Sequence, residues 1–150
     1  MKPLFVLLFA LSASVVSAQQ VYLRSEVKRV ATELGIPPNI AEALVERESE
    51  FNPTAINPND PSYGIMQLYK ENLDWFADHF NEGKKFNPFD PTISIRIGLE
   101  YLASLYKMFG NWFDTLAAYN AGPAAVSKKK YPASTVRYVN WILNRSLEEK

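Results

Sequence analysis

The chain has 150 residues, with 16 basic and 16 acidic side chains, one histidine and no cysteine. This balanced charge argues against nucleic-acid binding, because nucleic-acid binders usually carry a basic field over one face. Without cysteine the fold cannot use disulfides, so its stability must come from packing of the apolar residues, which form 47% of the sequence. A chain of this length is expected to form one domain.

The amino-terminal segment predicts a secretory signal peptide. Lys2 supplies a positive end, residues 4–16 are apolar, and small residues lead to a predicted cleavage site after Ala18. The apolar run is shorter than the about 20 residues that span a bilayer; the alternative is a retained amino-terminal anchor helix. We therefore expect removal of residues 1–18, which leaves residues 19–150 as a periplasmic or secreted monomer without stable membrane insertion.

Periodic apolar residues predict a mostly helical domain. From Val21 to Leu34 they recur at three- and four-residue steps, which puts them on one helical face, and Gly35 then offers a helix stop. A second helix is expected from Pro38 to Glu48, because proline suits a first helical turn. Four further helices are expected over residues 71–80, 91–108, 112–119 and 134–147, with Asp90 and Ser134 as amino-terminal caps of the second and the fourth.

Residues 52–64 are rich in proline, asparagine and aspartate, and this composition predicts a long ordered loop. Strand signals are weak, although the chain around Gly64 and Ile65 could pair briefly with another loop. The expected fold class is all-α, or helical with a small β part at most. The basic run Lys128–Lys130 is interpreted as a solvated loop, with a rim contact to an anionic polymer as the alternative.

Glu48 is the candidate acid of an active site. It follows an apolar helical segment and precedes the loop, so its carboxyl could lie at the floor of a cleft. A partly apolar pocket raises the pKa of a carboxylic acid toward neutrality, which suits protonation of a glycosidic oxygen. Taken alone, Glu46, Glu48 and Glu50 are more simply a solvated helix end. The surrounding motifs decide between these interpretations.

Three motifs follow one another in the chain: Glu48-Ser49 with Phe-Asn-Pro at 51–53, Gly-Ile-Met-Gln-Leu at 64–68, and Ala-Tyr-Asn-Ala-Gly-Pro at 118–123. Together they resemble the lytic transglycosylase domain, and the resemblance covers nearly all of residues 19–150. It implies a lysozyme-like helical fold that cleaves peptidoglycan glycan strands between N-acetylmuramic acid and N-acetylglucosamine.

The resemblance also implies roles for individual residues around the first two motifs. Glu48 takes the role of the family's acid, and Ser49 is its motif neighbour or simply a cap of the helix end. Gly64 would let the backbone approach the sugar, and Gln67 would form a hydrogen bond with the sugar. Met66 belongs to the same motif, where contact with substrate and core packing are equal alternatives.

The remaining matched positions lie toward the carboxyl end. Tyr119 and Asn120 are implied to lie near the acid and the acetamido group of the sugar. Tyr138 looks like the family's carboxy-terminal tyrosine, with core packing as the alternative. Two places depart from the family pattern: Ser94 stands where asparagine is expected, which weakens a packing hydrogen bond, and residues 57–61 replace a stretch of small residues at the cleft rim.

No obvious second carboxylate accompanies Glu48, because Asp60, Asp74 and Asp90 are candidates by composition only. A lytic transglycosylase needs none, since the C6 hydroxyl of muramic acid attacks its own anomeric carbon. The competing hypotheses are a goose-type lysozyme, which delivers water instead, and a glycan-binding module without catalysis. The sequence predicts no metal or other cofactor, because His79 stands alone and no glycine-rich phosphate loop is present.

Overall fold

The computed structural model describes the backbone of residues 3–148 and the side chains of residues 18–148. Most of the chain is helical, in α1 (Pro3–Glu33), α2 (Pro38–Ser49), α3 (Leu73–Phe80), α4 (Pro91–Phe109), α5 (Trp112–Ala121), α6 (Pro123–Ser127) and α7 (Ala133–Ser146). The small antiparallel sheet has the order β1 (Ile56–Asn57), β2 (Ser62–Tyr63), β3 (Leu68–Tyr69), and the 3-10 turn η1 (Lys70–Asn72) leads into α3. This architecture confirms the predicted fold class.

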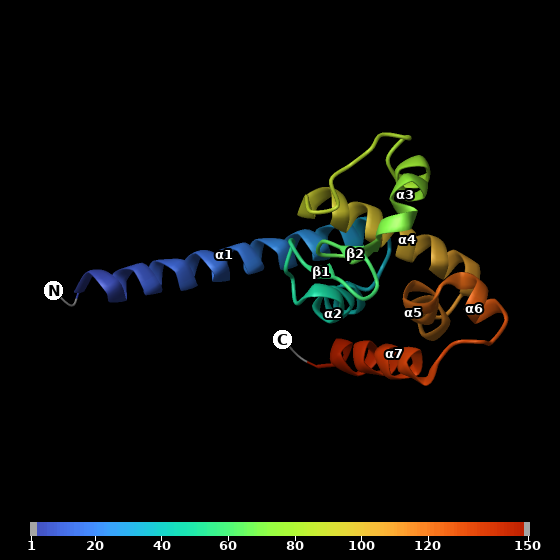
Figure 1. Cartoon of the computed structure of the whole chain (residues 1–150). Helices are drawn as coiled ribbons and strands as arrows, with labels where there is room; N and C mark the ends of the chain where they lie inside the picture. The colour runs from blue at the N-terminus through green and yellow to red at the C-terminus, as the bar shows by residue number, and fades with distance from the viewer. Residues whose placement is uncertain (1–2, 149–150) are drawn as a thin grey trace.

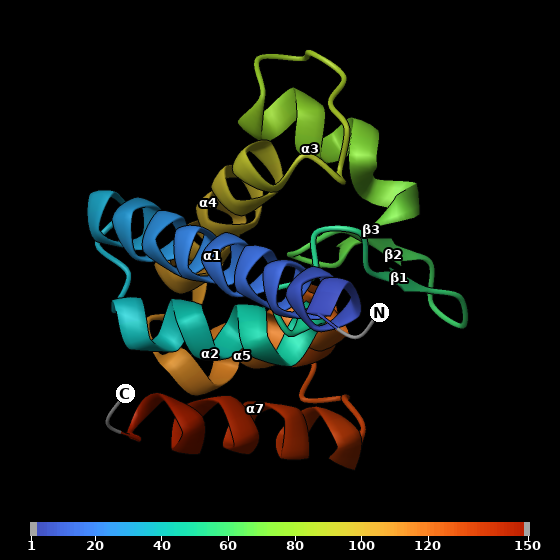
Figure 2. The ribbon, with the colours of Figure 1, turned by 90° about the vertical axis from the view of Figure 1, so that its left-hand side faces the viewer.

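The helices pack around α2 and α5. Helix α2 lies between α1 and α7, and α5 packs against both α4 and α7 (Figure 2). The amino-terminal half of α1 extends away from the other helices, and α3 packs against α4 (Figure 1). In the part of the chain that the structure describes, none of the helices combines the length and apolar character needed to span a bilayer.

The core forms where the apolar faces of these helices meet. Helix α2 contributes an apolar face to it, since Ile40, Ala41, Ala43, Leu44 and Val45 are all buried. On α1, Leu23 is buried as expected but Val21 is 65% exposed. The two residues lie about 200° apart around a helix of 3.6 residues per turn, so they cannot share one face.

Three predicted helix starts differ from the structure, and the helix expected from residue 71 begins at Leu73, after η1. Helix α1 begins at Pro3 rather than near Val21. No glycine or proline interrupts the chain between Pro3 and Gly35. Helix α7 begins at Ala133 with Pro132 as its cap residue, so Ser134 lies within the first turn and the prediction that it caps the helix was wrong.

The Asp90 cap is confirmed, because its carboxylate accepts hydrogen bonds from the backbone amides of Thr92 and Ile93. The predicted loop at residues 52–64 also contributes to the sheet: Ile56 pairs with Tyr63, and Tyr63 with Leu68. The pairing predicted around Gly64 thus falls on the residues that flank it. Helix α6, which has only five residues, was not predicted.

Candidate active site

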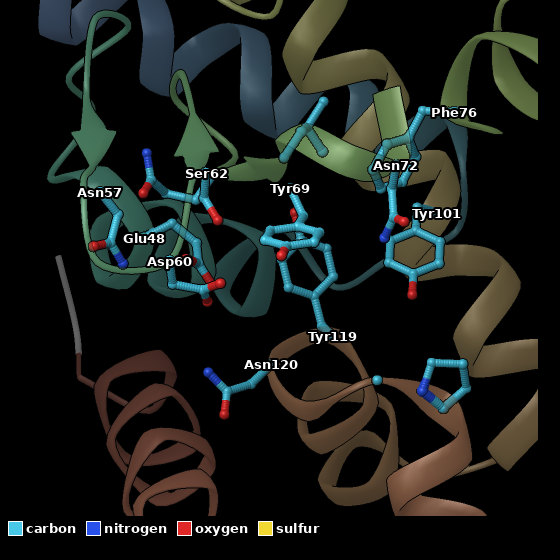
Figure 3. A pocket seen from close by; sticks show the side chains of 14 residues that line it. Glu48, Asn57, Asp60, Ser62, Tyr69, Asn72, Phe76, Tyr101, Tyr119 and Asn120 are labelled. Atoms are coloured by element: carbon cyan, nitrogen blue, oxygen red, sulfur yellow. The ribbon is translucent and has the colours of Figure 1, made fainter. Parts of the chain in front are cut away.

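A cavity of about 370 Å³ opens between α2, the β1–β2 hairpin, α3, α4 and the α5–α6 junction (Figure 3). Among the residues whose side chains are described, the lining carries two carboxyl groups, several amides and three tyrosines, and no lysine, arginine or histidine. It comprises Glu48, Asn57, Asp60, Ser62, Gln67, Leu68, Tyr69, Asn72, Phe76, Tyr101, Tyr119, Asn120, Gly122 and Pro123. A cavity with this lining suits a neutral, hydroxyl-rich ligand.

Glu48 reaches this cavity because α2 ends immediately after it. Glu50 and Phe51 adopt left-handed backbone angles, with φ of 52° and 61°, which stops the helix. The buried Phe51 ring anchors the reversal, with the Arg24 guanidinium 4.1 Å from its centroid. The apolar face of α2 therefore delivers Glu48 to the edge of the core as a partly buried carboxyl.

Burial raises the pKa of Glu48 to about 7, and this effect outweighs two opposing ones. The hydrogen bond from Tyr138 and the positive charge of Arg47 both favour the ionised form and lower the pKa. A carboxyl with this pKa is present in both protonation states near neutral pH. It can therefore donate a proton and later accept one.

Tyr138, on α7, is buried and donates its phenol hydrogen to Oε1 of Glu48. Burial, together with the charge of Glu48, raises the pKa of Tyr138 well above its usual value, so the phenol keeps its proton. The Arg47 guanidinium lies 6.0 Å from the centroid of the Tyr138 ring and 5.5 Å from that of Trp141. The structure thus places Tyr138 against the acid, and its ring is also part of the core.

The third motif lies across the cavity on α5. The Tyr119 hydroxyl donates a hydrogen bond to the carbonyl of Met66 at 2.8 Å, and burial raises its pKa well above the usual value. The Asn120 side-chain oxygen accepts a hydrogen bond from the Thr135 hydroxyl at 2.8 Å. This bond sets the orientation of the amide and leaves its NH₂ group for a ligand. Both Tyr119 and Asn120 line the cavity.

Gly64 and Ser49 hold the second motif in place, and neither lines the cavity. Gly64 has a φ of 75°, and a Cβ there would lie 2.0 Å from the carbonyl oxygen of Pro88. Its lack of a side chain is therefore required by the neighbouring chain, and the expected approach of its backbone to a sugar stays a prediction. The Ser49 hydroxyl donates to the carbonyl of Ile65 at 2.8 Å, which ties the end of α2 to this motif.

Met66 and Gln67 have different environments. Met66 is fully buried, and a Cβ on Gly98 would lie 2.6 Å from its Cε, so its side chain belongs to the core. Gln67 lines the cavity, and its amide nitrogen donates to the carbonyls of Gly64 at 3.0 Å and Ala55 at 3.3 Å. Gln67 also has a positive φ of 48°, a strained conformation of the kind that gathers at functional sites.

Ser94, the departure from the family pattern, lies in the core behind this loop. It is fully buried, and its hydroxyl has no hydrogen-bond partner among the described residues. The absence of a partner agrees with the weaker packing hydrogen bond expected at this position.

Several lining residues were not identified from the sequence. Asn57 and Ser62 come from the β1–β2 hairpin, while Asn72, Phe76 and Tyr101 come from η1, α3 and α4. Only residues 57–61 carried a signal, as a departure from the family pattern. Periodicity could not find the others because it identifies a buried face and not which buried residues border a cavity.

The three candidate second carboxylates have different positions in the structure. Asp60 is exposed on the hairpin and lines the cavity with Glu48. Asp74 is exposed and outside the lining, and Asp90 caps α4.

His79 stacks on Trp75 with ring centroids 4.1 Å apart. Among the described residues, no group of three or more histidine, aspartate or glutamate side chains could hold a metal ion.

Residues 26–142 match the Transglycosylase SLT domain family, so the chain belongs to this family of transglycosylase domains. It is 35% identical over 103 residues to the soluble lytic murein transglycosylase of Escherichia coli K12, an alignment that covers 66% of this chain and 16% of that protein. It is also 30% identical over 101 residues to Protein IpgF of Shigella flexneri, covering 63% of this chain and 64% of IpgF. The chain therefore spans less than two-thirds of the length of either relative.

Solved structures show the same fold. An inactive glutamate-to-glutamine mutant of lytic transglycosylase Slt from Pseudomonas aeruginosa aligns with a TM-score of 0.73 and 25% identity, over 83% of this chain and 23% of that one. The 70 kDa soluble lytic transglycosylase of Escherichia coli aligns with a TM-score of 0.72 and 27% identity, over 81% of this chain and 23% of that one. A 70 kDa soluble lytic transglycosylase in complex with bulgecin A aligns with a TM-score of 0.70 and 27% identity. The family and lysozyme-like fold implied by the sequence motifs are confirmed.

Proposed function

We propose that this protein is a peptidoglycan lytic transglycosylase that cleaves the β-1,4 bond between N-acetylmuramic acid and N-acetylglucosamine, with Glu48 as acid and then base. The observation that carries the proposal is the Glu48 carboxyl, held in a ligand-sized cavity with a pKa of about 7 and a hydrogen bond from Tyr138. The family membership and the lytic transglycosylases among its relatives support the same reaction.

The reaction proceeds in two proton transfers. Protonated Glu48 donates its proton to the glycosidic oxygen as the bond to the anomeric carbon breaks, which releases the N-acetylglucosamine end. The resulting carboxylate then takes the proton of the muramic acid C6 hydroxyl as that oxygen attacks the anomeric carbon. The product carries a 1,6-anhydro ring, no water is consumed, and Glu48 returns to its protonated state.

The polar groups around Glu48 suit the positioning of the sugar. The 2-acetamido group of muramic acid can stabilise positive charge at the anomeric carbon if it is held beneath it. The Asn120 amide and the Gln67 side chain both line the cavity and offer hydrogen bonds for this purpose. Tyr119 holds the second motif through Met66 and forms part of the cavity wall.

A hydrolase of the goose-lysozyme kind is the second candidate, because Asp60 lines the same cavity as Glu48. Inverting glycosidases use a second carboxylate to activate water on the opposite face of the sugar. In that reaction the product would carry one added water and a reducing end. A glycan-binding module without catalysis would release no product.

The amino-terminal segment supports a proposal about export and cellular location. We propose that residues 1–18 direct export and are then removed, so that a monomeric enzyme meets peptidoglycan in the periplasm or outside the cell. Amino-terminal sequencing of the exported protein tests this: a first residue other than Gln19 would contradict the predicted cleavage site.

The decisive experiment is mass spectrometry of the soluble products released from purified peptidoglycan. Wild-type protein is expected to release anhydro-muropeptides, and Glu48→Gln to release none while keeping its fold by circular dichroism. The inactive mutant of the relative from Pseudomonas aeruginosa also carries a glutamate-to-glutamine change. Products with an added water would establish the hydrolase, and activity in Glu48→Gln would reject the role of Glu48.

A further inference from the structure

Trp75 is a large apolar side chain that helix α3 presents to solvent. It is 43% exposed, whereas the next two residues, Phe76 and Ala77, are buried against the body of the protein. An exposed tryptophan is common at binding surfaces, because its ring offers a broad apolar face with a polar N–H at its edge. Trp75 itself does not line the cavity that contains Glu48.

Neighbouring rings hold the Trp75 ring in place. His79 stacks on it at a centroid distance of 4.1 Å with an interplanar angle of 27°. Phe76, Phe80 and Tyr101 contact it at 5.4, 5.6 and 5.7 Å, with interplanar angles between 72° and 79°. A ring held by four others loses little rotational freedom when a ligand binds, which lowers the entropic cost of binding.

These contacts also connect Trp75 to the cavity. Phe76 and Tyr101 both line the cavity, and both are in ring contact with Trp75. In Figure 3, Phe76 and Tyr101 lie at the opposite end of the cavity from Asp60, and Glu48 lies toward the Asp60 end. Trp75 is therefore in contact with the rings at the end of the cavity that is farther from Glu48.

We propose that Trp75 forms a further sugar-binding subsite, on which a distal N-acetylhexosamine of the glycan strand held in the cavity stacks. This proposal rests on the proposed function. A β-1,4-linked sugar in its chair form presents axial C–H groups on a ring face, and these pack against an aromatic plane. The exposed carboxylates of Asp74 and Asp78, on the same helix, can accept hydrogen bonds from sugar hydroxyls.

The cavity lining has no cationic side chain among the described residues, and Trp75 has an acidic flank; both favour uncharged sugar groups over anionic groups at this surface. The subsite therefore predicts that the enzyme gains affinity from strands long enough to reach from Glu48 to α3. Short strands that end inside the cavity would gain less from Trp75.

The test compares kcat and KM on short and long glycan strands for wild type, Trp75→Ala and Trp75→Phe. Trp75→Ala is expected to raise KM on long strands about tenfold, with a several-fold smaller effect on short strands and with kcat on long strands little changed. Trp75→Phe should recover part of the loss. Equal losses on long and short strands would overturn the proposal, as would an unchanged KM on long strands.

A matched control separates this effect from general loss of an exposed aromatic ring. Tyr106, on α4, is 37% exposed and stacks on Trp112 with ring centroids 4.4 Å apart, but neither residue lines the cavity. Tyr106→Ala should leave the length dependence as in wild type. The same length-dependent loss in Tyr106→Ala would count against a specific subsite at Trp75.

A binding measurement separates the failure of this proposal from that of the proposed function. In protein carrying Glu48→Gln, long glycan strands should change the tryptophan fluorescence, and Trp75→Ala should remove most of the change. Binding through Trp75 without any product from wild-type protein would support the subsite and reject the enzyme. A concentration-dependent dimer that Trp75→Ala abolishes would instead assign this surface to a second copy of the chain and overturn the subsite.

Discussion

The Tyr138 phenol on α7 donates a hydrogen bond to Oε1 of Glu48 at the end of α2, across 90 positions of sequence. The bond favours the ionised carboxylate, and burial of the same group favours the neutral acid. Burial is the larger effect, so the pKa of Glu48 is raised to about 7, and the hydrogen bond keeps it from rising further. The balance between these two effects determines the pH range in which Glu48 can act as an acid.

Tyr138→Phe should move this pH range upward. Loss of the hydrogen bond removes an interaction that lowers the pKa of Glu48, so the pKa rises and the acid stays protonated to higher pH. The descending limb of the kcat/KM profile should therefore shift to higher pH. The maximal rate should fall about ten- to hundredfold, because a hydrogen bond to a charged group contributes about 1.5–3 kcal/mol. An unchanged descending limb would contradict the assignment of that limb to Glu48.

Arg47→Gln should produce a shift in the same direction by a different cause. The guanidinium lies beside the Tyr138 ring, and its charge lowers the pKa of Glu48, so its removal raises that pKa. Arg47→Lys keeps the charge and should restore most of the wild-type profile. Lys107→Gln, which removes an exposed charge from α4, is the matched control and should leave the pH profile in place.

Glu48→Gln should stabilise the protein at high pH. The carboxyl has an ordinary pKa of 4.5 when exposed and a pKa of about 7 in the fold, so the folded state binds its proton more tightly. The free energy of unfolding of wild type therefore falls as the pH rises from about 4.5 through about 7. Glutamine does not ionise and avoids this loss.

Urea unfolding of wild type and Glu48→Gln at two pH values measures this effect. The variant should be more stable by about 1–3 kcal/mol at about pH 8, and the difference should shrink at about pH 4. A difference that does not depend on pH would show that the carboxyl is not buried as a neutral group.

Gly64→Ala should destabilise the loop that carries the second motif. A Cβ there would lie 2.0 Å from the Pro88 carbonyl oxygen, and the backbone has a positive φ. We expect a loss of about 3 kcal/mol or more, since overpacking adds to the cost of the left-handed backbone. Gly110→Ala is the control: its φ is 72° with nothing within 4 Å of the added Cβ, so it should cost only about 1–2 kcal/mol. Thermal unfolding with similar losses for both would contradict the close contact.

Ser94→Ala should stabilise the protein, because it removes a buried hydroxyl that has no partner among the described residues. A buried unsatisfied polar group costs about 1–3 kcal/mol, so we expect the free energy of unfolding to rise by about 1 kcal/mol. Chemical denaturation measures the change. A destabilised Ser94→Ala would indicate that the hydroxyl has a partner in solution.

The sequence by itself determined the helical class, most helix positions and the family. Recurring apolar residues and helix-terminating residues located most of the helices, and Asp90 was correctly predicted as a cap. These features are local, since a helical face and a cap depend on residues within a few positions of one another. The three motifs identified the family because their order and spacing can be read directly from the sequence.

The tertiary structure decided how the site is built. Only packing of α7 on α2 brings Tyr138 to Glu48, and the close approach of Pro88 to Gly64 appears only in the folded chain. The presence of Asp60 in the cavity and the contact of the exposed Trp75 ring with Tyr101 likewise depend on elements distant in sequence. The pKa of a carboxyl is set by whatever surrounds it in space, and the sequence gives no distances between segments that meet only after folding.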